Sequence, residues 1–291
     1  MKRNARIGRA TARARLSVQV LLPVLAMVAS ISCSVVAARP ITVKGSDTMV
    51  ILGQRWAEKY MNEHPGQVIM VTGGGSGTGI AALINGTTEI CQASRPMKPD
   101  EKLKLRDRYQ STGVEIPVAK DGLSIYVHEA NGVKQLTIDQ LKGIYMGTIT
   151  NWKQVGGAEA TILLYGRENS SGTYGFFKDN VLGGRDFSER VQTLPGTAAV
   201  VNAVSKDRNG IGYGGAAYAK GVRDLAIQHD AKSPAILPKA ETVHDGSYPL
   251  SRYLYFYTRR QPEGDTKKFV AWVLSPQGQE IAAKVGYFPL K

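Results

Sequence analysis

The stretch at residues 165–177, YGRENSSGTYGFF, holds the residue types with the clearest potential for chemistry. It follows an apolar run at 162–165, typical of a buried strand, and precedes residues 175–182, which predict a short helix. The first N–H groups of such a helix lack intrahelical partners, Ser171 and Thr173 add hydroxyls, and Gly172 permits close approach. With the fork of Arg167, this turn is suited to bind an anion. A loop that only caps a helix is the alternative for this motif taken alone.

Two further strand, turn and helix units occur near the start of the chain. Residues 41–45 predict a strand, which leads through Ser46, Asp47 and Thr48 into an amphipathic helix at 49–62. Ser46 or Asp47 could also serve simply as the N-cap of that helix. Residues 67–71 predict the second strand, followed by the glycine-rich turn TGGGSGTG at 72–79 and a helix.

The glycine-rich turn matches no nucleotide or nucleophile motif. It lacks the terminal Gly-Lys-Ser or Gly-Lys-Thr of a P-loop, and the spacing of its glycines is wrong for a dinucleotide fingerprint. A nucleophile elbow would need glycine where Thr78 stands. A simple anion cradle fits better, because it requires only close approach, the Ser76 hydroxyl and the amides at the helix start.

Ser94 and Arg95 follow a short third strand at 87–92 and stand before a proline. This order predicts a hydroxyl and a guanidinium fork near the same edge of the sheet. A salt bridge at the surface is the alternative role for Arg95. Cys91, just before them, is most simply a small core residue.

The rest of the chain predicts a second series of strands and helices. Residues 114–119 and 123–127 form a long extended segment with a bend at 121–122, and residues 136–145 a helix capped by Thr137. A second extended run lies at 249–257, before two final helices. The pattern predicts an α/β fold of two lobes, each a mainly parallel sheet flanked by helices, with the ligand in the interlobe cleft. We assign residues 39–121 and 251–291 to lobe I and residues 122–250 to lobe II.

Residues 1–38 read as a secretory signal peptide. A basic region without acids precedes an apolar run at 16–31, and Val36-Ala37-Ala38 fits a cleavage site. Cys33 leaves a lipid anchor as the alternative, although the residues before it match a lipoprotein signal poorly. The prediction is a periplasmic or otherwise extracytoplasmic protein.

Composition narrows the classes of function. The formal net charge is +13, and the signal peptide carries six of those positive charges. The remaining charge is scattered without a nucleic-acid-binding signature, so we expect no nucleic-acid partner. The four histidines are far apart and pair with no cysteine or carboxylate at ligand spacing, so we expect no metal and no cofactor.

The ordered motifs resemble the phosphate-binding protein of bacterial ABC phosphate transporters. The similarity covers essentially the whole mature chain: GSDT at 45–48, GGSGTG at 74–79, Ser94-Arg95, the helix at 136–145 with Thr150-Asn151-Trp152, and residues 167–173. It implies a type II periplasmic-binding-protein fold that captures inorganic phosphate and delivers it to membrane permease subunits driven by an ATPase. It also implies a ligand shell at Ser46, Thr48, Ser76, Ser94, Arg95, Arg167, Ser171, Gly172 and Thr173.

The chain departs from this family in one respect. Some members carry an aspartate at the end of the third strand that accepts the remaining proton of phosphate, where this chain has Ser94. A carboxylate acceptor favours hydrogen phosphate over fully ionised sulfate. We hypothesise that Asp47 takes this role.

Other functions stay open at this level. The same fold could bind sulfate, molybdate or another oxyanion, or serve as a sensor or adhesion module. A secreted phosphatase or other serine hydrolase would need an activated nucleophile, yet no histidine lies near Ser76 or Ser171. We therefore expect a monomeric binding protein rather than an enzyme.

Overall fold

The structure, a computed structural model, describes residues 39–290, which belong to one compact unit. The predicted signal peptide, its cleavage site and Cys33 lie outside the described residues. Within residues 39–290, no helix combines the length and apolar character needed to span a membrane.

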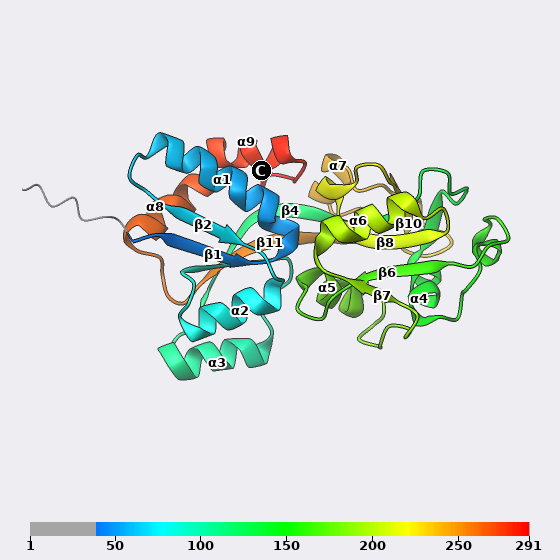
Figure 1. The fold of residues 1–291 in the computed structure, drawn as a ribbon, viewed down its shortest axis with the longest axis horizontal. Coiled ribbons are helices and arrows are strands. Elements are labelled where there is room, and N and C mark those ends of the chain that lie inside the picture. The colour runs from blue at the N-terminus through cyan, green and yellow to red at the C-terminus, as the bar shows by residue number, and fades with distance from the viewer. Residues whose placement is uncertain (1–38, 291) are drawn as a thin grey trace, which may run out of the picture. The chain divides into compact units, whose positions relative to one another are not determined.

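The described strands build one main sheet, whose order is β2-β1-β3-β11-β4-β8-β6-β7 (Figure 1). Its outer pairs β1–β2, β1–β3, β6–β7 and β6–β8 are parallel, whereas the two long strands β11 and β4 run antiparallel to their neighbours. The bounds are β1 Ile41–Gly45, β2 Ile69–Thr72, β3 Ile90–Ala93, β4 Val114–Val127, β6 Leu163–Arg167, β7 Gln192–Leu194, β8 Gly210–Gly215 and β11 Ser251–Thr258. The short β9 (Arg223–Asp224) pairs with β4, and β10 (Ala226–Gln228) pairs with β5 (Gln135–Thr137).

The long strand β4 joins the two halves of the sheet. It pairs with β11 up to Gly122 and with β8 from Leu123 onward. The predicted bend at residues 121–122 is wrong, because Asp121 and Gly122 keep their places in the ladder opposite β11. The irregularity lies earlier in β4, where Val118 is skipped because the consecutive β11 residues Leu254 and Tyr255 face Ala119 and Pro117.

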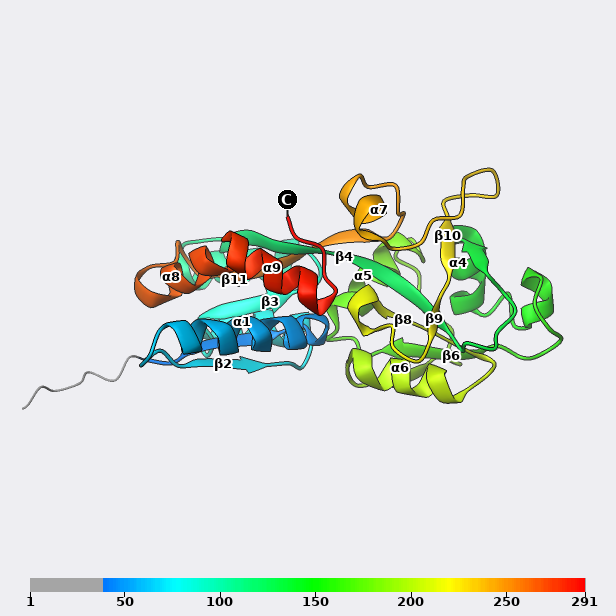
Figure 2. The ribbon, with the colours of Figure 1, turned by 90° about the horizontal axis from the view of Figure 1, so that it is seen from above.

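The helices of the first half cover both faces of its sheet (Figures 1 and 2). Trp56 and Phe269 lie against Phe256 of β11, and the Trp56 indole N–H donates to the carbonyl oxygen of Gly278 at 2.7 Å. These contacts bury an aromatic core between the sheet and one helical layer. That layer contains α1 (Val50–Glu63), α8 (Gly264–Val273) and α9 (Pro276–Val285); the other contains α2 (Ser76–Asn85) and α3 (Pro99–Tyr109).

The second half has its own core, in which Phe177 stacks on Tyr213 of β8 at 4.2 Å between ring centroids. The preceding residue on β8, Gly212, faces Val200 and Val204 of the helix on the opposite side of the sheet. As predicted, Thr137 caps its helix and accepts a hydrogen bond from the Gln140 amide at 3.1 Å. The helices are α4 (Ile138–Met146), α5 (Gly172–Asn180), α6 (Gly196–Lys206) and α7 (Ala240–His244), with 3-10 turns η1 (Asp47–Met49), η2 (Trp152–Val155) and η3 (Ala216–Tyr218).

The two hydrophobic cores draw on different parts of the chain. One main cluster takes its buried residues from 41–119 and 254–287, and the other from 123–250. On this basis we keep the division into lobe I (39–121 and 251–291) and lobe II (122–250) as a proposal, and use these names below.

Candidate functional site

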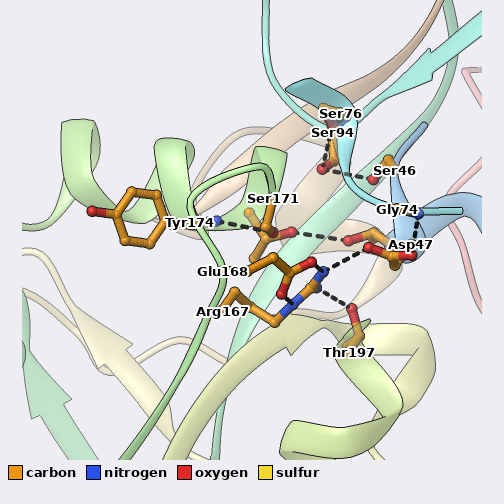
Figure 3. A network of polar contacts seen from close by, with 12 residues as sticks. Ser46, Asp47, Gly74, Ser76, Ser94, Arg167, Glu168, Ser171, Tyr174 and Thr197 are labelled. Carbon is orange, nitrogen blue, oxygen red and sulfur yellow. Dashed lines mark hydrogen bonds and ion pairs between the residues drawn. The ribbon is translucent and has the colours of Figure 1, made fainter. Parts of the chain in front are cut away.

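Five hydroxyl side chains from four separate turns meet in a buried cluster, here called the hydroxyl cluster: Ser46, Thr48, Ser76, Ser94 and Thr173. Ser46 Oγ donates to Ser94 Oγ at 2.9 Å, and Ser76 Oγ lies 3.5 Å from the same oxygen (Figure 3). Thr48 Oγ1 and Thr173 Oγ1 are 2.9 Å apart. The structure therefore brings together most of the predicted ligand residues, which are drawn from both proposed lobes.

These turns converge because each follows the carboxyl end of a strand. Ser46 follows β1, Ser76 begins α2 after β2, and Ser94 follows β3. Because parallel strands of one sheet end at the same edge, their turns lie side by side there. The turn after β6 reaches the same place from lobe II, where the Gly77 amide donates to the Ser170 carbonyl oxygen at 2.8 Å.

Gly172 lies closer to lobe I than any other residue type would permit. A Cβ atom at this position would be 2.2 Å from Ser76 Oγ and 2.7 Å from Ser94 Oγ. A Cβ atom does not come that close to an oxygen to which it is not bonded, so the approach of α5 to the hydroxyl cluster as observed requires glycine. The sequence indicated that Gly172 permits close approach, and the structure shows that the atoms it approaches are Ser76 Oγ and Ser94 Oγ.

Two helices begin at the cluster, α2 at Ser76 and α5 at Gly172. Their first-turn N–H groups lie outside the intrahelical hydrogen-bond ladder, and the helix dipoles add partial positive charge. Ser171 is the N-cap of α5, and its Oγ accepts a hydrogen bond from the Tyr174 amide at 3.3 Å. Both readings of this serine motif, helix cap and part of an anion site, are thus compatible.

The guanidinium of Arg167 lies beside the cluster with its side chain only 1% exposed. Its Nη2 donates to Asp47 Oδ2 at 2.9 Å and to Glu168 Oε1 at 3.0 Å, and Nε donates to Glu168 Oε2 at 3.1 Å. Nη1 donates to Thr197 Oγ1 at 2.7 Å. Figure 3 shows this guanidinium between the two carboxylates and the threonine. Its direction is therefore fixed from three sides.

Glu168 is ionised beside this arginine. Burial opposes its ionisation, but the hydrogen bonds and the positive charge of Arg167 together outweigh burial and lower the pKa of the Glu168 carboxyl. Two carboxylates thus share one arginine, and the Arg167 environment carries a formal net negative charge. An anion bound here would depend largely on N–H and O–H dipoles.

Asp47 does not cap a helix. Ser46 holds the N-cap position of η1 without a side-chain hydrogen bond, and Asp47 Oδ1 accepts from the Gly74 amide at 2.8 Å. The prediction is therefore wrong for Asp47, because the glycine-rich turn and Arg167 offer its carboxylate donors that the short 3-10 turn does not, and Ser46 takes only the N-cap position of η1. The Tyr218 hydroxyl fixes the backbone of Asp47 by donating to its carbonyl oxygen at 2.8 Å. Burial, reinforced by the Asp47 charge, raises the pKa of Tyr218 to about 12, so this hydroxyl stays a donor.

The structure does not bring the Arg95 guanidinium to the hydroxyl cluster. Its two terminal nitrogens donate to the Glu101 carboxylate at 2.8 and 2.7 Å, and Nη1 also donates to the Pro96 carbonyl oxygen. Glu101 is fixed in turn by the Lys98 amide at 2.7 Å. The alternative of a salt bridge is therefore the one observed, although it is largely buried, and Arg95 and Arg167 do not together balance a dianion.

Four residues of this region were not predicted from the sequence: Glu168, Thr197, Asp121 and Arg252. Glu168 carried a weak signal because it follows Arg167 directly. Thr197 lies in the first turn of α6, and the other two lie inside long strands, where only the fold reveals their contacts. Cys91 is fully buried, as predicted, and burial raises the pKa of its thiol. No cluster of potential metal ligands occurs among the described residues.

Comparisons with known proteins show the family to which this chain belongs. A family model described as a PBP superfamily domain matches residues 13–277. The phosphate-binding protein PstS of Pseudomonas aeruginosa is 35% identical over an alignment of 263 residues, which covers 84% of this chain and 81% of that protein.

Two solved structures have similar folds. A substrate-binding protein from Clostridium perfringens, assigned to a phosphate ABC transporter and solved with bound phosphate, has 29% identity and a TM-score of 0.78. The alignment covers 87% of this chain and 100% of that one. An ABC-type phosphate transport receptor from Vibrio cholerae has 30% identity and a TM-score of 0.69, with coverage of 85% and 99%.

Proposed function

Because this chain belongs to the PBP superfamily and, within it, to the PstS phosphate-binding proteins, we propose that it captures inorganic phosphate and delivers it to an ABC importer. Its partners are then the membrane permease subunits of that importer. We further propose that it works as a monomer outside the cytoplasm. The ligand lies between lobe I and lobe II, at the hydroxyl cluster.

The observation that supports this proposal best is the meeting of five buried hydroxyls, two helix starts and the Arg167 guanidinium at one place. Hydroxyls and first-turn amides can all donate to an oxyanion, and Arg167 has one further Nη1 N–H beyond its bonds to Asp47, Glu168 and Thr197. The proposed ligand shell is Ser46, Asp47, Thr48, Ser76, Ser94, Arg167, Ser171, Gly172 and Thr173.

The available bonds are sufficient for tight binding. A hydrogen bond to a charged group contributes about 1.5–3 kcal/mol, and micromolar affinity corresponds to roughly −8 kcal/mol. Six or seven such bonds exceed this value by enough to offset the cost of association and ordering. The site therefore needs no bound metal to hold an anion.

The carboxylate of Asp47 supports phosphate over sulfate. Each carboxylate oxygen can accept more than one hydrogen bond, so Asp47 can accept the proton of hydrogen phosphate as well as its present donors. Sulfate carries no proton at neutral pH and would meet the Asp47 and Glu168 charges without compensation. We propose that Asp47 is the group that discriminates between these anions.

We expect Asp47→Asn to reduce the preference for phosphate over sulfate by about tenfold or more, because one lost charge-assisted bond is worth about that ratio. Calorimetric titration with both anions at one pH measures it. Asp107→Asn is the matched control, since the Asp107 side chain is 72% exposed on α3. An unchanged preference in Asp47→Asn would show that another group discriminates.

The test of the function itself is calorimetric titration of the purified mature protein, stripped of bound anion, with phosphate and then sulfate. We expect micromolar or tighter phosphate binding with little response to sulfate. If titration with phosphate gives no binding signal, the proposal is contradicted. A stronger response to sulfate or molybdate would assign the site to that oxyanion instead.

We also propose that the chain is not an enzyme. A serine hydrolase would need a base beside its nucleophile, and among the described residues no histidine bonds to the hydroxyl cluster. Incubation with a chromogenic phosphate ester is expected to give no turnover. Turnover that disappears in Ser76→Ala or Ser171→Ala would revive the phosphatase alternative.

A further inference from the structure

A second buried arginine, Arg252, lies directly against the hydroxyl cluster. It belongs to β11, where it faces Asp121 of β4 in the antiparallel ladder. Arg252 Nε and Nη2 donate to Asp121 Oδ2 at 3.0 and 2.7 Å, and the two side chains are 2% and 1% exposed. The pair lies next to the position where β4 exchanges β11 for β8 as its partner.

The remaining terminal nitrogen of Arg252 contacts both proposed lobes. Nη1 donates to the carbonyl oxygen of Ser94 at 3.2 Å and to Thr173 Oγ1 at 3.1 Å. Its guanidinium carbon also lies 5.3 Å from the ring centroid of Phe176, one turn along α5. Arg252 thus joins the end of β3 in lobe I to the start of α5 in lobe II.

The hydrogen bond from Arg252 to Thr173 restricts the direction in which the Thr173 hydroxyl can donate. An arginine only donates hydrogen bonds, so Thr173 Oγ1 must accept this one. The single proton of the hydroxyl then points away from Arg252. In the present structure the other neighbour of that oxygen is Thr48 Oγ1, within the cluster.

Stability alone does not account for such a pair. Removing two charges from water is costly, and replacing a buried ion pair by apolar residues of similar volume is often neutral or stabilising. Asp121 neutralises the charge of Arg252 and fixes its orientation. The Nη1 group of Arg252 donates instead to the Ser94 carbonyl oxygen and to Thr173 Oγ1 at the site. The arrangement is suited to direct a neighbouring group.

We propose that Arg252, held by Asp121, is a positioning residue for anion binding: it makes the Thr173 hydroxyl a donor toward the anion and holds the ends of β3 and α5 together. This inference rests on the proposed phosphate function. Arg252 acts through Thr173 and Ser94 and does not itself contact the anion.

A double-mutant cycle tests the inference, with phosphate affinity measured by calorimetry in the wild type, Arg252→Met, Thr173→Val and the double variant. We expect each single variant to bind about tenfold more weakly. If Arg252 acts through the Thr173 hydroxyl, the double variant loses little more than either single variant. Losses that multiply to about 100-fold, or an unchanged affinity in Arg252→Met, would overturn the inference.

Arg252→Met leaves Asp121 buried without its partner, so the fold needs its own control. The pair variant Asp121→Leu with Arg252→Met removes both charges, and thermal unfolding is expected to remain cooperative near the wild-type midpoint. Its phosphate affinity is expected to fall as in Arg252→Met. Arg252→Lys keeps the charge but loses the fork, and retention of full affinity in that folded variant would also contradict the inference.

A matched control separates this effect from a general loss of arginine. Arg259, just beyond the other end of β11, donates to the Thr88 carbonyl oxygen and bonds to no member of the hydroxyl cluster. Arg259→Met is expected to bind phosphate as the wild type does. Absence of phosphate binding in the wild type would contradict the proposed function, whereas normal wild-type binding with a normal Arg252→Met contradicts only this inference.

Discussion

Replacing Arg167 by methionine is expected to weaken phosphate binding by at least about 100-fold, the largest effect of any single side chain in the site. One N–H of Arg167 Nη1 is not used by Asp47, Glu168 or Thr197, so one charge-assisted hydrogen bond of about 1.5–3 kcal/mol to the anion is lost, and each 1.4 kcal/mol is about tenfold in affinity. The variant also leaves the carboxylates of Asp47 and Glu168 without their arginine, so the anion would meet uncompensated negative charge. Calorimetric titration with phosphate measures the loss.

Two comparison variants and a measurement of folding test this prediction. Thr173→Val removes one hydroxyl and is expected to cost only about tenfold. Arg167→Lys keeps the charge without the planar fork and should fall between the two. Thermal unfolding of each variant shows whether the fold is retained. Equal losses for Arg167→Met and Thr173→Val would contradict a dominant role for the arginine.

The alanine variant of Gly172 is the second change with a large expected effect. Its Cβ would be 2.2 Å from Ser76 Oγ and 2.9 Å from Ser76 Cβ, so α5 and the Ser76 side chain must move apart to reach ordinary contact. Several donors would then leave hydrogen-bonding range, and losing two of them corresponds to about 100-fold in affinity. The measurement is phosphate titration of Gly172→Ala.

The steric origin of this loss can be separated from a loss of helix stability. Alanine is favoured over glycine within a helix by roughly 1 kcal/mol, so the substitution does not weaken α5 itself. Gly132→Ala is the control, since a Cβ there meets no atom within 4 Å. We expect normal binding in Gly132→Ala and normal thermal unfolding in both variants. Normal phosphate binding in Gly172→Ala would mean that the two lobes need not approach as closely as in this structure.

Local sequence signals account for the elements that carry the site. Alternating or continuous apolar runs predicted the strands, and serine and glycine at their ends predicted the turns into helices. Thr137 was recognised as a cap because its hydrogen bond spans only three residues. The resemblance to a known family then indicated which of these turns meet, and the structure places most of those hydroxyls together.

Partners that lie far apart in the chain could not be predicted in the same way. Asp47 and Arg167 are 120 positions apart, and Asp121 and Arg252 are 131 positions apart. Their pairing depends on which strands become neighbours, and no local pattern encodes that. Arg95 shows the same limit at short range, because its direction was decided by Glu101 only six positions away.

The sequence by itself thus determined the strand, turn and helix units and the supply of hydroxyls and glycines at strand ends, because these depend on local periodicity and turn chemistry. Only the tertiary structure decided the electrostatics of the site. It directed Arg95 away from the hydroxyl cluster, surrounded Arg167 with two carboxylates and placed Arg252 behind Thr173. The physical reason is that a charged side chain takes its direction from whichever partners the assembled fold brings within hydrogen-bonding distance.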